Sequence, residues 1–206
     1  MKSRQKWFRE ENAKARGFSL TELVVTMAVA MVLMGIGMPY FLRAYHAYQL
    51  TNAAEQLSDI LRLTRYEAIR LNKPVNCQVQ PDAGDPTITD AFADDNGNLT
   101  PDPTEKIVLL GMGGNLAGGT IPGTSGMLTA ANVTSGTTVV APGTSAVQFD
   151  ARGAVTVAGA ITNNVYVFYL ASPVAPEAGY RAVLLMPSGS IQIWTGDVNG
   201  NWAQLR

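Results

Sequence analysis

Residues 94–105 bring together oxygen-bearing side chains whose spacing suits a metal ion. The candidate calcium ligands are the side chains of Asp94, Asn96, Asn98, Asp102 and Glu105 and the backbone carbonyl of Thr100. The side chains fall at offsets 1, 3, 5, 9 and 12, the spacing of an EF-hand-type loop. Leu99 stands at the sixth place, where the sharp turn favours glycine, and Pro101 and Pro103 stiffen the loop. Two interpretations stay open, a calcium site and a polar loop of Asx turns that needs no ion.

Other reactive chemistry is sparse, because the chain has one cysteine and one histidine. Cys77 cannot form an intramolecular disulfide or a cysteine metal cluster. With His46 as the single histidine, neither a Ser-His-Asp triad nor a multi-histidine zinc site can be built. We therefore expect no catalytic residues, no enzymatic role and no cofactor other than calcium.

An uncharged run of 20 residues, Leu23 to Leu42, follows a basic N-terminal segment. As a helix it would be about 30 Å long, the thickness of a bilayer's hydrocarbon core. The first 17 residues carry six Lys or Arg against two Glu, a net charge of +4, which leaves the remainder at −5. By the positive-inside rule the basic leader stays in the cytoplasm and everything after Leu42 lies on the far side of the membrane.

Three simpler interpretations of this run compete: a secretory signal peptide cut near Ala28-Val29-Ala30, a plain membrane anchor, and a buried helix of a soluble protein, which the sequence favours least. The first conflicts with the apolar residues 31–34 that follow the triplet, since a secretory cleavage site normally opens onto a polar chain. The second leaves Glu22 unexplained, because a carboxylate in an apolar membrane segment is costly without a partner.

The residues that begin this run, Arg16-Gly17-Phe18-Ser19-Leu20-Thr21-Glu22-Leu23, resemble the prepilin cleavage and methylation motif of type IV pilin-like proteins. The resemblance implies that a prepilin peptidase cuts after Gly17 and that the new N-terminal residue, Phe18, is N-methylated. It also implies that Glu22, fifth in the mature chain, serves assembly. In an apolar helix bundle the nearest available cation for Glu22 is the amine of a neighbouring subunit's Phe18.

Past Leu42 the sequence predicts an amphipathic helix that continues to Leu71. Apolar residues recur at spacings of three and four, and Asn72-Lys73-Pro74 ends the pattern. In the apolar half, Gly35, Gly37 and Pro39 resemble the helix break of pilins, where loss of a backbone hydrogen bond lets the helix kink or unwind during packing.

The remaining sequence predicts a mainly antiparallel β head. Alternation from Pro74 to Gln80 indicates a strand with Cys77 on its buried side. Asp150–Gly153 and Pro187–Gly189 are expected to be hairpin turns. Further strands are expected at 107–112, 137–141, 146–149, 154–157, 165–170, 181–186 and 190–195.

The expected fold class is α+β, a long N-terminal helix packed on an antiparallel sheet. The expected parts are a cleaved leader (1–17), a transmembrane or filament-core helix (18–42), an amphipathic helix packing on the head (43–72) and the β-rich head (73–206).

The order of helix and strands resembles the GspH/FimT branch of pseudopilins and minor pilins. The local matches are residues 65–69, Pro74-Val75 and 149–153. The resemblance does not cover residues 113–136, which are expected to form a long loop or a lightly structured insertion. The resemblance implies a structural subunit of a type II secretion pseudopilus or a type IV pilus. Its implied partners are other pilins in the filament, the prepilin peptidase and an inner-membrane assembly platform. The chain would start in the cell inner membrane, with its head in the periplasm, and then enter the filament.

DNA binding for uptake is the alternative function, because some FimT-like minor pilins bind DNA through basic residues near the C-terminus. Here that region offers only Arg181 and Arg206, and the chain after the leader is acidic. The sequence therefore favours the structural role.

Overall fold

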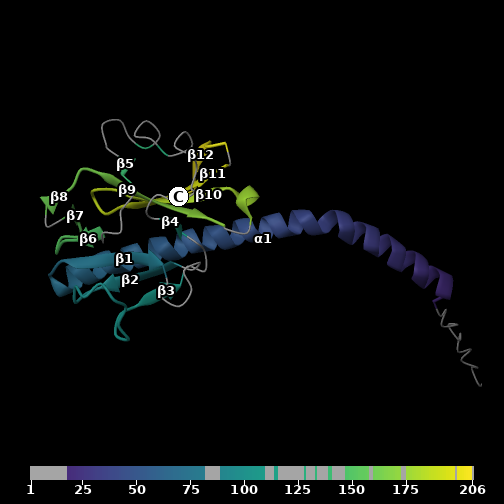
Figure 1. Cartoon of the computed structure of the whole chain (residues 1–206), viewed down its shortest axis with the longest axis horizontal. Helices are drawn as coiled ribbons and strands as arrows, with labels where there is room; N and C mark the ends of the chain where they lie inside the picture. The colour runs from purple at the N-terminus through teal and green to yellow at the C-terminus, as the bar shows by residue number, and fades with distance from the viewer. Residues whose placement is uncertain are drawn as a thin grey trace, which may run out of the picture. The chain divides into compact units, whose positions relative to one another are not determined.

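The computed structural model describes residues 18–81, 89–109, 114–115, 128, 133, 139–140, 147–157, 160–172, 175–197 and 199–205. The predicted leader with Gly17, most of the predicted loop at 113–136, and Arg206 lie outside these residues. The chain divides into two compact units, Met1–Phe41 and Leu42–Arg206. Helix α1, Leu20–Leu71, contributes to both (Figure 1).

In the first unit the described residues form the N-terminal part of α1. The carbonyl of Ser19 accepts the backbone N–H of Leu23 at 3.1 Å, which begins the helix. Every residue from Phe18 to Phe41 is exposed. Pro39 lies inside α1, which continues through it. That this segment unwinds during filament packing stays a prediction.

In the second unit, the part of α1 after Leu42 packs against two sheets. The first sheet is antiparallel, with the order β3-β2-β1-β6-β7-β8. Its strands are β1 (Val75–Pro81), β2 (Thr89–Asp94), β3 (Ile107–Leu109), β6 (Val147–Phe149), β7 (Val155–Val157) and β8 (Ala160–Ile161).

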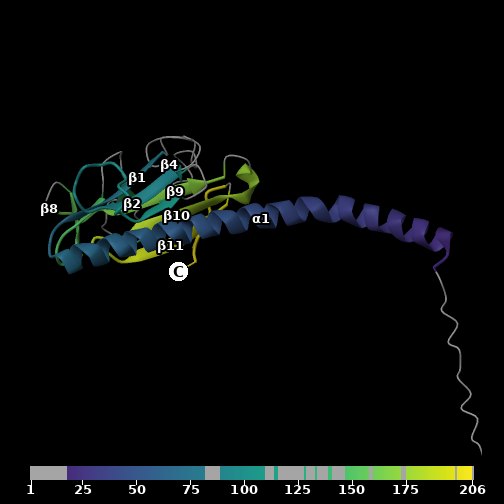
Figure 2. The same ribbon diagram turned by 90° about the horizontal axis from the view of Figure 1, so that it is seen from below.

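The second sheet has the order β12-β11-β10-β9-β4, and β5 pairs with β9 in parallel. Figure 2 shows the second half of α1 running along β10 and β11. The strands are β4 (Gly114–Asn115), β5 (Val139–Val140), β9 (Val165–Ala171), β10 (Tyr180–Leu185), β11 (Ile191–Gly196) and β12 (Trp202–Gln204), and a 3-10 turn, η2 (Pro176–Ala178), precedes β10.

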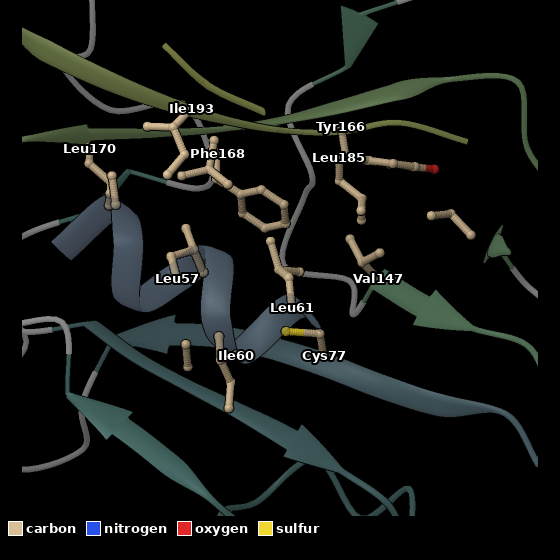
Figure 3. Packing of buried hydrophobic residues seen from close by; sticks show 14 of the residues in the cluster. Leu57, Ile60, Leu61, Cys77, Val147, Tyr166, Phe168, Leu170, Leu185 and Ile193 are labelled. Atoms are coloured by element: carbon tan, nitrogen blue, oxygen red, sulfur yellow. The ribbon is translucent and has the colours of Figure 1, made fainter. Parts of the chain in front are cut away.

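The main core lies between the buried face of α1 and both sheets. Leu57 and Leu61 are fully buried on the helix, where they meet Phe168 of β9 and Cys77 of β1 (Figure 3). A second cluster, which includes Tyr169 and Leu184, covers the opposite face of the second sheet. Each large apolar side chain that is fully buried contributes about 1.5–3 kcal/mol to folding. Burial on both faces explains why β9 is a continuous apolar run instead of an alternating one.

The predicted helix end is confirmed, and its hydrogen bonds explain it. Asn72 adopts a left-handed φ of 50°. Its N–H donates to the carbonyl of Ile69, and the N–H of Lys73 donates to the carbonyl of Ala68, both at 3.3 Å. This pair of bonds is the Schellman arrangement that caps the C-terminus of a helix, and Pro74 then starts the path to β1.

The α+β class, the strand at 74–80 and both hairpin turns are confirmed, but the prediction missed four of the strands that the described residues form. These are β2, β4, β8 and β12. β2 is buried along its whole length although its sequence, Thr-Asp-Ala-Phe-Ala-Asp, is poor in residues that favour strands. It forms because it pairs with β1 across six registered positions, a tertiary contact that the local sequence does not reveal.

Candidate functional site

The predicted assembly residues sit at the exposed start of α1. Phe18 is 80 % exposed, and Glu22 lies in the first turn of the helix, also exposed. A carboxylate in a first turn is stabilised by the positive end of the helix dipole. Among the residues that the structure describes, Glu22 forms no ion pair. The predicted cleavage residue, Gly17, lies outside the described residues.

The apolar half of α1 is uncovered. Its large apolar side chains between Leu20 and Leu42 are each between 44 % and 79 % exposed. By length and composition the helix could cross a membrane. An apolar surface of this extent needs lipid or other protein chains around it.

The predicted calcium ligands share one loop between β2 and β3, held by hydrogen bonds of its own. Asp94 Oδ1 accepts the N–H of Gly97 at 2.6 Å, and Asp94 Oδ2 accepts that of Leu99 at 3.2 Å. Leu99 takes a left-handed φ of 62°, so it makes the sharp turn for which glycine was expected. The Asn96 Oδ1 and Asn98 Oδ1 atoms each accept an N–H two residues ahead, at 2.9 Å.

The far end of this loop is closed by Glu105, which accepts the N–H groups of Asp95 at 3.2 Å and Asp102 at 3.0 Å. Asp102 Oδ2 accepts the side-chain amides of Asn96 and Asn98. The loop is thus a series of Asx turns, one of the two arrangements that the sequence allowed. Among the described residues, no group of three His, Cys, Asp or Glu side chains is placed to hold a metal ion. Calcium binding stays a prediction.

Arg65 joins the helix to both sheets, a role that the sequence did not indicate. Its Nη1 donates to the carbonyl of Gly189 at 3.1 Å. A Cβ added at Gly153 would lie 2.7 Å from Arg65 Nε, and one at Gly189 would lie 2.9 Å from the same atom. The two hairpin turns are also linked directly, because Val155 N–H donates to the Pro187 carbonyl at 3.2 Å. Both turns thus need glycine next to the guanidinium of Arg65. Residues 65–69 and 149–153, two of the segments that resemble the GspH/FimT branch, are therefore in contact in the fold.

Arg181, one of the two basic residues considered for DNA binding, is turned into the head. It is 8 % exposed, and its Nε donates to Thr51 Oγ1 at 3.1 Å. Burial lowers the pKa of Arg181. A side chain in this position does not present its charge to an external phosphate backbone.

Cys77 lies in the main core, as the alternation predicted. It is 1 % exposed, and burial raises the pKa of its thiol to about 12. Because the thiolate is the reactive form, this cysteine is a packing residue.

Comparison with known proteins adds the family. Residues 53–189, about two thirds of the chain, match the family model described as type II transport protein GspH. Residues 12–38 match the prokaryotic N-terminal methylation motif. No significant match is found among curated proteins or among solved structures. With a long N-terminal helix, antiparallel sheets and both family matches in place, the chain belongs to the GspH family of type IV pilin-like pseudopilins, whose members are structural subunits.

Proposed function

We propose that this chain is a minor pilin or pseudopilin that inserts into a membrane-based filament, which it primes or caps. The stem, α1, supplies assembly contacts, and the head supplies contacts to partner subunits. The proposal also includes an inner-membrane start with the head in the periplasm, followed by entry into a secretion pseudopilus or pilus.

The observation that carries this proposal is the exposed start of α1. The first two turns of α1 present an exposed apolar surface that contains one carboxylate, Glu22. Among the described residues, no cation pairs with this carboxylate. Cleavage after Gly17 would create an amine at Phe18, and a carboxylate of one subunit next to the amine of another would fix the register of packed helices. A pair that forms only between subunits suits an assembly role.

The test is to replace Glu22 with alanine and to measure filament incorporation and membrane insertion separately. We expect E22A to insert normally and to be lost from sheared filament fractions. Thr26→Ala is the matched control, since it removes a polar group one turn further along the same helix and should incorporate normally. Normal incorporation of E22A would show that the register role is wrong.

Processing can be tested on the same preparations. Protein recovered from filaments should begin at Phe18 with a methylated amine, as read by mass spectrometry of the N-terminal peptide. Recovery of chains with any other N-terminus would contradict both the cleavage site and the pairing of Glu22 with that amine.

DNA uptake gains no support as a second function. Arg181 is buried against α1, and Arg206 lies outside the described residues.

A further inference from the structure

One side of α1 in the second unit is exposed along its length. The side chains of α1 that are buried in the main core recur at spacings of three and four, which places them on one face of the helix. The exposed positions recur at the same spacings on the opposite face. We call this opposite face the outer face of α1, and its members are Tyr48, Asn52, Glu55, Asp59, Arg62, Tyr66 and Ile69.

The outer face changes in charge along the helix. Its middle is acidic, because Glu55 and Asp59 lie one turn apart. One cation, Arg62, follows them. The last two members are large and mainly apolar side chains, Tyr66 at 62 % exposed and Ile69 at 48 % exposed. The outer face therefore has an acidic segment followed by a basic and apolar segment.

Asp59 and Arg62 are only weakly paired within the subunit. Asp59 Oδ1 and Arg62 Nη1 are 3.6 Å apart, and the two side chains are 74 % and 57 % exposed. An ion pair this exposed contributes little to stability, so both charges can pair with another molecule. Arg70, at the edge of the outer face, differs, because its Nε donates to Glu67 Oε2 at 2.6 Å. Arg62 is therefore the cation best placed to meet a partner.

The order of these charges restricts how two such faces can meet. In parallel helices without an offset, Glu55 would face Glu55 and Arg62 would face Arg62, and like charges repel. An offset from residue 55 to residue 62 keeps the same sides of both helices together, because it is close to two full turns. This offset is about 10 Å at the helical rise, and it sets Glu55 of one helix opposite Arg62 of the other. Asp59 then faces the Tyr66 hydroxyl, and no like charges of the two outer faces meet.

We propose that two copies of this chain dock through their outer faces, parallel and offset by about 10 Å, so that Glu55 of one copy pairs with the partner's Arg62. The proposal rests on the proposed function, because subunits that enter a filament from one membrane have parallel helices. Burial of Tyr66 and Ile69 supplies affinity, and the charges fix the offset. The outer face thus selects a staggered neighbour and rejects one in register.

The first test exchanges the two charges in the full chain in detergent and measures self-association by sedimentation. We expect Glu55→Arg and Arg62→Glu each to weaken the dimer about tenfold, and the double variant to regain the original association, because the pair is restored with opposite polarity. Glu177→Arg is the matched control, since it makes the same charge change at an exposed residue of η2 and should have no effect. A double variant no better than the single variants, or no dimer of the unchanged chain, would overturn the proposal.

Disulfide mapping tests the direction and the offset. Chains with Tyr45→Cys are mixed with chains with Asn52→Cys, which lie opposite each other in the proposed contact, and are mildly oxidised. We expect the mixed disulfide to exceed either same-site disulfide about tenfold. The native Cys77 is buried and does not compete.

Two other patterns of disulfides would contradict the proposed contact. Same-site disulfides in excess would show helices without an offset, and a mixed disulfide between Tyr48→Cys and Ile69→Cys would show antiparallel helices. Filament incorporation of E22A is measured separately and does not depend on the outer face. Loss of E22A from filaments together with a failed charge exchange would leave the proposed function intact and remove only this contact.

Discussion

Gly97 and Gly189 have nearly the same backbone conformation in different surroundings, which allows strain to be separated from steric overlap. Their φ angles are +78° and +77°. A Cβ at Gly97 would have nothing within 4 Å, whereas at Gly189 it would lie 2.5 Å from the carbonyl oxygen of Gly153. We expect Gly97→Ala to lower the free energy of unfolding by about 1–2 kcal/mol through the left-handed conformation alone. Gly189→Ala adds overlap and should cost about 2–4 kcal/mol.

The comparison is made by urea unfolding of the full chain in detergent, followed by tryptophan fluorescence. Equal costs for the two variants would show that the turn at Gly189 can move away from Arg65 and that the contact between helix and turns is loose.

The thiol of Cys77 gives a prediction about reactivity. Its pKa is raised from 9.0 to about 12 by burial, so the folded chain near pH 8 holds about a thousandfold less thiolate than the unfolded chain. We expect alkylation at pH 8 to be slower in the native protein than in concentrated urea by at least about that factor. Rapid native labelling would place Cys77 outside the core.

Burial of the Cys77 thiol also makes the stability of the protein depend on pH. The folded-state pKa lies above the unfolded value, so the contribution of the protonated thiol is fully present below pH 9 and is lost as the pH rises from about 9 to 12. The loss should be smaller in Cys77→Ala, measured as the unfolding midpoint at several pH values.

Single residues also mark the limit of what the sequence could predict. The burial of Cys77 follows from the alternation of its own strand. The role of Arg65 does not, because its partner Gly189 lies 124 residues away, and a charged residue on a helix is normally assigned to the solvent face. The burial of Arg181 likewise depends on distant residues, since its partners Thr51 and Ala47 lie 130 and 134 residues away.

At the scale of elements, the end of α1 depends on one residue, Asn72. Its left-handed φ of 50° is tolerated by asparagine and preferred by glycine. We expect Asn72→Ala to lower the free energy of unfolding by about 1 kcal/mol and Asn72→Gly to leave it unchanged or raise it slightly. Urea unfolding of both variants checks this. If alanine and glycine behave alike, the Schellman cap does not limit the helix.

The loop between β2 and β3 can be interpreted as a calcium site or as a loop of Asx turns that needs no ion. Its hydrogen bonds are made without an ion, so we expect calorimetry on the full chain in detergent to show no heat with millimolar calcium. Magnesium is the control for nonspecific charge screening. A calcium-specific signal that disappears in Glu105→Gln would establish the metal interpretation, for which the left-handed Leu99 already supplies the required turn.

Helices, strands and turns could be predicted where their own residues show a helical or strand periodicity or contain turn-forming residues. The long helix, both glycine turns and the apolar strands β9, β10 and β11 follow from periodicity and turn residues. β2 and the short strands β8 and β12 do not, since their pairing depends on partners elsewhere in the sheets. The parallel pairing of β5 with β9 is likewise a property of the assembled sheet.

At the scale of the whole molecule, the proposed cleavage changes the charge as well as the N-terminus. The chain has a formal net charge of −1, and removing the first 17 residues removes a net +4. The mature chain is therefore more acidic than the precursor. Its charge repels a nucleic acid backbone, and Arg181 is turned inward.

We therefore expect mature chain to give no gel shift with duplex DNA at about 100 mM salt. Gly17→Ala is the matched control, because blocked cleavage retains the basic leader on an otherwise identical chain. That precursor should show weak binding that falls steeply with salt, since Lys and Arg contacts to phosphates release counterions. Salt-sensitive DNA binding by the mature chain itself would show that its head presents a basic surface, and would restore DNA uptake as a function.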